Sequence, residues 1–251
     1  MADHATARQP DGSNDRSSDM NSLVQQVPSP SNRPSGHLRG RFWSRRSTWI
    51  LATLASIAVA IASYRYVIGV GPMPPKIVAN VFASPWLPLH AAAAATSLLI
   101  GPFQFLPRLR SARPALHRWT GRVYAVTCLF GAVSGLILAL GTTMGPVAMA
   151  GFGSLSVIWA FTIGYGWQRA REHRFPDHRR WMIRSWVLTF AAVNLRVYLS
   201  IAGVFGIPFD LSYPIISFLA WVPNLILAEL YLARTDRPKR QTQRLLLDQV
   251  S

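Results

Sequence analysis

Apolar runs long enough to cross a lipid bilayer recur along most of this chain. A helix needs about 20 predominantly apolar residues to span the hydrocarbon core of a membrane. Six runs reach that length, and they cover residues 48–67, 86–106, 122–141, 147–167, 181–202 and 213–233. The pattern predicts an all-α polytopic membrane protein built as a bundle of six transmembrane helices.

The segments outside these runs differ in composition. Residues 1–40 are rich in Ser, Asn, Asp, Gln and Pro and show no hydrophobic period, so we expect a disordered cytoplasmic tail there. The transmembrane domain is expected over residues 41–234, and a basic cytoplasmic tail over 235–251. The 251-residue chain as a whole is 50% hydrophobic and 14% charged, which excludes an ordinary soluble domain.

The positive charges alternate from one connector to the next. Connectors 68–85, 142–146 and 203–212 hold only Lys76 as a cation, whereas the other connectors and both tails are rich in arginine. Of the 26 Lys and Arg residues, 23 therefore fall on one side of the predicted bundle. The positive-inside rule then places both termini in the cytoplasm. Because topology explains the arginines, the net charge of +16 does not indicate a nucleic-acid partner.

A short motif occurs twice. Arg118-Trp119-x-x-Arg122 and Arg180-Trp181-x-x-Arg184 are 62 residues apart, and the same offset superimposes the second and third helices on the fourth and fifth. A duplicated helical hairpin is one interpretation. The other is that helix starts in the inner leaflet generally favour Arg and Trp at the level of the lipid headgroups. Both interpretations remain open at this point.

Three of the predicted helices carry a polar face with a histidine. Projected at about 100° per residue, His90, Ser97 and Gln104 share a face of the second helix. The third and fifth helices have similar faces, and because intramembrane polar groups are costly, we expect all three to point into a shared interior. The ligand-binding residues predicted from these faces and from the intramembrane charges are His90, His117, His178, Arg196, Gln104, Tyr124 and Glu229.

The intramembrane charges need partners of their own. Glu229 is expected to pair with one of the arginines at the cytoplasmic helix starts, namely Arg118, Arg122, Arg180 or Arg184. Arg196 lies toward the other side, where Asp210 is the only acidic residue. We expect Arg196 to reach Asp210, to extend toward the lipid headgroups, or to bind an anionic ligand.

Several motifs resemble those of a known family. They are Leu116-His117-Arg118-Trp119-x-Gly121-Arg122-x-Tyr124, His178-Arg179-Arg180-Trp181-Met182-x-Arg184-Ser185, and Trp221-x-x-Asn224 followed by Glu229. With these residues the chain resembles an uncharacterised bacterial family of polytopic membrane proteins, domain of unknown function 2306, from about His90 to Glu229. The resemblance implies an inner-membrane protein and no particular reaction. It places His90, His117, His178, Arg196 and Glu229 at recurring polar positions of the family.

Three functional hypotheses follow from the sequence. The first is a membrane protein that binds or moves a small or lipid-like ligand, such as a lipid or quinone, through the His-lined polar interior. The second is a haem-b electron-transfer protein with His117 and His178 as axial ligands. The third is a structural or assembly subunit, in which the Gly-rich helix faces serve only packing. No catalytic or metal site is predicted, because no carboxylate accompanies a His at ligand spacing in the outer half. The oligomeric state is left open.

Overall fold

A computed structural model describes residues 36–71 and 73–248, with side chains for residues 47–71 and 73–235. The contacts divide the chain into one unit that ends at Thr48 and a second unit over residues 49–251. Most of the tail predicted over residues 1–40 lies outside the described residues. Its last five residues, 36–40, begin helix α2 (Gly36–Ser63), and most of the predicted C-terminal tail belongs to helix α12 (Val222–Asp248).

Every regular element of the described residues is a helix. Six helical stretches are long and apolar enough to cross a membrane, which confirms the six predicted spans. They are Ser47–Ile68, Ala83–Gln104, Pro114–Leu140, Gly145–Arg171, Phe175–Val204 and Phe209–Thr235. The third and fifth spans begin several residues before their apolar runs, because the basic segments in front of those runs continue the helix.

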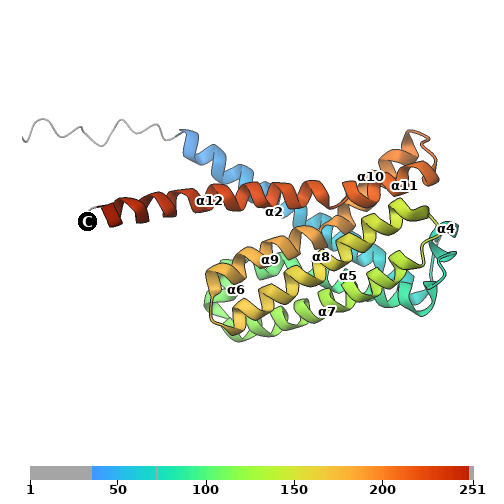
Figure 1. Ribbon diagram of the computed structural model, residues 1–251, viewed down its shortest axis with the longest axis horizontal. Coiled ribbons are helices and arrows are strands. Elements are labelled where there is room, and N and C mark those ends of the chain that lie inside the picture. Colours follow the sequence, from blue (N-terminus) through green and yellow to red (C-terminus); the bar gives the residue numbers. More distant parts are fainter. Residues whose placement is uncertain (1–35, 72, 249–251) are drawn as a thin grey trace, which may run out of the picture. The chain divides into compact units, whose positions relative to one another are not determined.

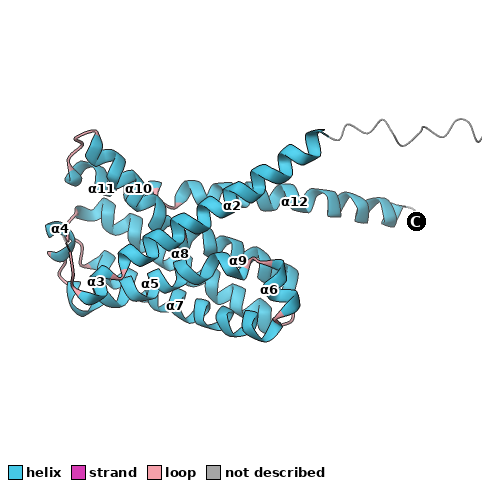
Figure 2. Cartoon of the chain, turned by 180° about the vertical axis from the view of Figure 1, so that it is seen from behind, coloured by secondary structure: helices cyan, strands magenta, loops and turns pink. Residues whose placement is uncertain are grey.

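Four helices form the centre of the second unit. They are α5 (Ala83–Gln104), α7 (Pro114–Leu140), α8 (Gly145–Arg171) and α9 (Phe175–Thr189), which lie side by side in Figures 1 and 2. Helix α5 packs on α7, α7 on α8, α8 on α9, and α9 contacts α5 again. The second, third and fifth spans, which carry the predicted polar faces, therefore meet around one core. That core contains Tyr124, Cys128, Trp159, Ile163 and Leu188.

The remaining helices pack on this ring. Helix α11 (Phe209–Leu219) contacts α8, and α12 contacts α9. A second core cluster joins α2, α5 and α10 (Ala191–Val204) through Ala60, Leu98 and Val193. Three short helices lie at the ends of the spans. They are α3 (Arg65–Ile68), α4 (Pro75–Val78) and α6 (Pro107–Ala112), and Figure 1 shows α4 and α6 at opposite ends of the bundle.

Two spans are broken near their middles, where the sequence predicts continuous helices, whereas the first span breaks near its end, at Tyr64 between α2 and α3. The fifth span breaks at Phe190, between α9 and α10, and the sixth breaks at Ala220 and Trp221, between α11 and α12. Backbone polar groups near a break inside a bilayer need partners within the protein. Two asparagine side chains supply them. The amide of Asn194 donates to the Ala220 carbonyl (3.3 Å), and the amide of Asn224 donates to the Val187 carbonyl (3.1 Å).

Candidate functional site

The predicted polar faces of the third and fifth spans meet in a buried hydrogen-bond network. The Tyr124 hydroxyl lies 3.2 Å from the Ser185 hydroxyl and 3.1 Å from that of Thr189. The Trp159 indole nitrogen donates to the Thr189 hydroxyl (3.1 Å), which itself donates to the Ser185 carbonyl (2.9 Å). All four side chains are buried. Their polar groups satisfy one another, so the network joins α7, α8 and α9 without needing a ligand.

The second span joins the third in the same way. The Ser97 hydroxyl donates to Thr127 (2.9 Å), and Nδ1 of His90 donates to the Gly131 carbonyl (2.9 Å). A Cβ atom added to Gly131 would lie 2.9 Å from the ring of Trp159, so the helices approach closely there. His90, Gly131 and Trp159 line neither of the two cavities described below. The polar interior is therefore a packed interface between helices.

The two helix-start histidines occupy matching positions. His117 is the fourth residue of α7 and His178 the fourth of α9, and the backbone amide of each donates to the carbonyl of the capping residue, Arg113 or Arg174. These equivalent positions are 61 residues apart, one less than the Arg-Trp motif. The similar starts agree with both interpretations of the repeat.

The side chains of these histidines differ in their hydrogen bonds. Nδ1 of His178 donates to the Gly166 carbonyl of α8 at 2.7 Å. Nδ1 of His117 is buried without a hydrogen-bond partner. The two imidazoles interact electrostatically, and no hydrogen bond or ring contact joins them in the described part of the chain. Neither lines the described cavities.

Each of the four acidic residues with a described side chain pairs with a cation. The pairs are Lys76–Asp210 (2.6 Å), Arg169–Glu172 (2.6 Å), Arg174–Asp177 (2.5 Å) and Arg184–Glu229 (2.5 Å). The hydrogen bond from Arg169 holds the pKa of the Glu172 carboxyl below its usual range. The expected pairing of Glu229 with a helix-start arginine is confirmed. Of the three alternatives for Arg196, the pairing with Asp210 is wrong, because Lys76 of α4 pairs with that carboxylate.

Arg196 is half-buried in α10, and its hydrogen bonds go only to neutral groups. One guanidinium nitrogen donates to the Ala192 carbonyl of its own helix (2.9 Å), and the other terminal nitrogen donates to the Ser63 hydroxyl (2.8 Å). Arg65 of α3 lies close enough for the two positive charges to interact. Its guanidinium donates to the Tyr66 hydroxyl (3.2 Å), and its Nε is buried without a partner. Neither arginine has a carboxylate partner among the described side chains.

Three further polar side chains interact electrostatically with Arg196, namely Tyr66, His90 and Tyr213. We call Arg65, Tyr66, His90, Arg196 and Tyr213 the arginine site. The sequence singled out His90 and Arg196 but missed the other three. The sequence could have indicated Arg65 as well, since no Asp or Glu occurs between Asp19 and Glu172. An intramembrane arginine in that stretch therefore has no nearby acidic residue in sequence.

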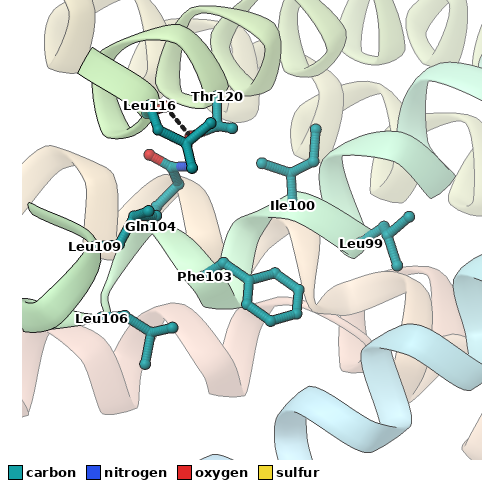
Figure 3. A pocket seen from close by; sticks show the side chains of 8 residues that line it. All are labelled: Leu99, Ile100, Phe103, Gln104, Leu106, Leu109, Leu116 and Thr120. Carbon is teal, nitrogen blue, oxygen red and sulfur yellow. Dashed lines mark hydrogen bonds between the residues drawn. The ribbon is translucent and has the colours of Figure 1, made fainter. Parts of the chain in front are cut away.

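An apolar cavity of about 330 Å³ lies between α5, α6 and α7 (Figure 3). It is lined by Leu99, Ile100, Phe103, Gln104, Leu106, Leu109, Leu116 and Thr120. The Gln104 amide donates to the Thr120 hydroxyl (2.8 Å) at its edge. Of the predicted ligand-binding residues, Gln104 is a lining residue of this cavity, whereas the Tyr124 side chain lies in the buried network. A second cavity of about 370 Å³ is lined by Trp167, Gln168, Arg171 and Glu172.

The described side chains include no cluster of three His, Cys, Asp or Glu residues that could hold a metal ion.

Six apolar helical spans with paired polar groups between them define a polytopic α-helical membrane protein. A family profile described as "Predicted membrane protein (DUF2306)" matches residues 87–232. The chain belongs to this family, which confirms the expected resemblance. Comparisons with curated proteins and with solved structures gave no match.

Proposed function

We propose that this membrane protein binds a small or lipid-like ligand with an anionic group at the arginine site. The observation that carries the proposal is the half-buried Arg196 guanidinium, whose hydrogen bonds go only to neutral groups. It interacts electrostatically with Arg65, and neither arginine has a carboxylate partner among the described side chains. Two like charges in a partly buried, low-dielectric environment repel each other. A bound anion would relieve this repulsion and replace the missing counter-ion.

The donors of the arginine site suit a carboxylate or phosphate. A guanidinium has five N–H donors, and Arg196 uses two of its nitrogens for neutral acceptors. The remaining N–H groups and the unpartnered Nε of Arg65 could donate charge-assisted hydrogen bonds to an anion. The Tyr66 and Tyr213 hydroxyls add further donors nearby. These groups support binding and orientation of an anion.

The interior favours binding over transport through the bundle. The sequence predicts a ligand path along the polar helix faces, but the side chains on these faces form hydrogen bonds with one another. Passage of a ligand would require these hydrogen bonds to break together. The proposal therefore keeps a ligand-binding role and places the ligand at the end of the bundle that holds Arg65 and Arg196.

The orientation of the protein is part of the proposal. The unequal distribution of positive charge favours an orientation with both termini in the cytoplasm, and the family resemblance favours the bacterial inner membrane as the location. An even number of spans is consistent with both termini on one side. In this orientation the arginine site belongs to the outer half of the bilayer, and the basic α6 and the starts of α7 and α9 face the cytoplasm.

A matched pair of probes tests the anion site. Purified full-length protein in a neutral detergent is heated with decanoate or with 1-decanol, which has the same chain length without the charge. We expect decanoate to raise the melting temperature more than decanol, and Arg196→Gln to remove that difference. Lys76→Gln is the control, because its side chain is exposed and pairs with Asp210. Equal shifts with both probes, or an unchanged difference in Arg196→Gln, would contradict the proposal.

A haem-b role at His117 and His178 is a second candidate. Its support is the buried, unpartnered Nδ1 of His117 and the matching positions of the two histidines at the starts of α7 and α9. An absorption spectrum of the detergent-purified protein, expressed with ample haem, tests this role. A Soret band that is lost in both His117→Ala and His178→Ala would support it, and no Soret band in the unmodified protein would exclude it.

If the protein binds neither an anionic ligand nor haem, a structural or assembly role remains, in which the close helix packing is the function.

A further inference from the structure

We propose that the cavity between α5, α6 and α7 holds one acyl chain of an anionic phospholipid, with the lipid headgroup bound by the arginines of α6. This site has a separate set of residues from the arginine site, and Figure 2 shows α6 at the opposite end of the bundle from α3, the helix that carries Arg65. In this site a lipid of the surrounding bilayer would be bound as a structural component of the protein.

The lining of the cavity fits a hydrocarbon chain. Six of its eight residues are Leu, Ile or Phe, and the two polar residues, Gln104 and Thr120, are joined by a hydrogen bond. The volume of about 330 Å³ lies at the lower end of the range of ligand pockets. An apolar chain can fill such a space without leaving a lining polar group unpaired.

Helix α6 places charge directly beside this apolar lining. Leu106, at its N-terminal cap, and Leu109 line the cavity, while Arg108 and Arg110 on the same short helix are exposed. An amphipathic helix of this kind lies at the membrane interface, with its apolar face toward the acyl chains and its basic face toward the headgroups. A lipid with its chain between the two leucines and α5 would have its phosphate next to these arginines.

The start of α7 marks the same level of the bilayer. Trp119 is 62% exposed, and it lies between Leu116 and Thr120, which both line the cavity. Exposed tryptophan is enriched at the boundary between hydrocarbon and headgroups. The adjacent Arg118 is exposed as well. The mouth of the cavity is therefore expected at the headgroup level.

The arginines around the cavity have no acidic partner among the described side chains. Arg108, Arg110 and Arg113 are exposed, and the four acidic residues with described side chains pair with other cations. No Asp or Glu occurs between Asp19 and Glu172 to supply another. A cluster of basic residues at a membrane surface attracts anionic lipid headgroups. This charge favours an anionic phospholipid over a neutral lipid or quinone as the occupant.

Native mass spectrometry of the full-length protein tests the site. The protein, in a neutral detergent, is incubated with equal amounts of phosphatidylglycerol and phosphatidylcholine that carry identical acyl chains. We expect preferential retention of phosphatidylglycerol. The double variant Arg108→Gln/Arg110→Gln should reduce that preference by about fivefold for each arginine removed. Arg171→Gln/Arg179→Gln is the matched control, since it removes two exposed arginines from the other basic connector and should leave the preference largely unchanged.

A second variant tests whether the cavity binds the acyl chain of the lipid. Leu116 lines the cavity and is 40% exposed, so Leu116→Trp should fill space without unfolding the bundle, and we expect it to reduce retention of phosphatidylglycerol. Equal retention of the two lipids by the unmodified protein would overturn the proposal. So would equal effects of the two double-arginine variants, or preferential retention of an added quinone. Arg196→Gln should leave the lipid preference intact, so this proposal and the anion site fail independently.

Discussion

The side-chain amide of Asn194 donates a 2.8 Å hydrogen bond to the side-chain oxygen of Asn224 and so joins the two broken spans. Asn194 lies on α10, just after the break at Phe190, and Asn224 lies on α12, just after the break at Trp221. The amide of each asparagine also donates to the Ala220 carbonyl (3.3 Å). The pair therefore holds α10 and α12 together and satisfies backbone groups of both spans.

Replacement of Asn224 by leucine should destabilise the bundle. The Val187 carbonyl would lose its side-chain donor, and the Asn194 amide would lose one of its two acceptors and keep the Ala220 carbonyl. We expect a loss of about 1–2 kcal/mol in the free energy of unfolding, between the small average value of hydrogen bonds in membrane proteins and the cost of an unsatisfied buried group. Reversible unfolding in mixed detergent micelles measures this loss.

The same measurement on Asn194→Ala and on the double variant completes a thermodynamic cycle. Because the two side chains act as one unit, the losses of unfolding free energy in the two single variants should add up to more than the loss in the double variant. Additive losses would show that the hydrogen bond between the asparagines contributes nothing of its own.

Part of this arrangement could be predicted from the sequence. The six spans follow from hydropathy because a bilayer requires long apolar helices. The second break also had a signal, since Pro223 has no N–H and its ring excludes the carbonyl four residues earlier, at Leu219. Helix α11 ends at Leu219. The first break had no such signal, because neither Pro nor Gly lies near Phe190. The side chain that donates to the Val187 carbonyl before this break, Asn224, belongs to another span.

The candidate sites were predictable to different degrees. His90 and Arg196 were found because polar residues inside an apolar run are costly and therefore conspicuous. Arg65 was interpreted as a charge near a helix end, because its proximity to Arg196 depends on how two distant spans pack. The apolar cavity had no sequence signal, since leucines that line a cavity and leucines that face lipid have the same pattern.

Two glycines of the same helix should respond differently to alanine. A Cβ atom on Gly151 would clash with the Ser217 side chain and lie 3.0 Å from its backbone carbonyl carbon, whereas one on Gly164 meets nothing within 4 Å. We expect Gly151→Ala to destabilise the protein by about 1–3 kcal/mol. Gly164→Ala should be neutral or stabilising by up to about 1 kcal/mol. Thermal melting in detergent compares the two, and similar melting temperatures would contradict the close contact of α8 and α11.

The ion pair of Arg184 and Glu229 should contribute more to stability than that of Lys76 and Asp210. Arg184 uses Nε and a terminal nitrogen for the two Glu229 oxygens (2.5 and 2.8 Å), and its side chain is 16% exposed. Both partners of the other pair are more than half exposed, and such pairs contribute about 0–1 kcal/mol. Double-mutant cycles with Arg184→Gln/Glu229→Gln and Lys76→Gln/Asp210→Asn should give the larger coupling energy for the first pair. A larger value for the second would show that burial and bidentate geometry do not decide the difference.

Reporter fusions should give alternating locations along the chain. If both termini are cytoplasmic, fusions after residues 75, 144 and 208 should report the outer side, and a fusion after residue 240 should report the cytoplasm. The physical reason is the concentration of 23 of the 26 cations on one side. A cytoplasmic signal at residue 144 would reverse the orientation and move the arginine site to the inner half of the membrane.

Replacement of Arg196 by leucine separates a binding role from a structural one. A charged side chain in the middle of a membrane helix costs at least about 2.5–3.5 kcal/mol on insertion scales. Arg196 recovers part of this cost by hydrogen bonds to Ala192 and Ser63, with no carboxylate partner described. If the arginine is kept for an anion, Arg196→Leu should raise the melting temperature of the ligand-free protein while it removes the response to decanoate. Ser63→Ala is the matched control, since it removes the neutral partner and keeps the charge. A large fall in melting temperature with Arg196→Leu, matched by Ser63→Ala, would identify Arg196 as a structural link between α2 and α10.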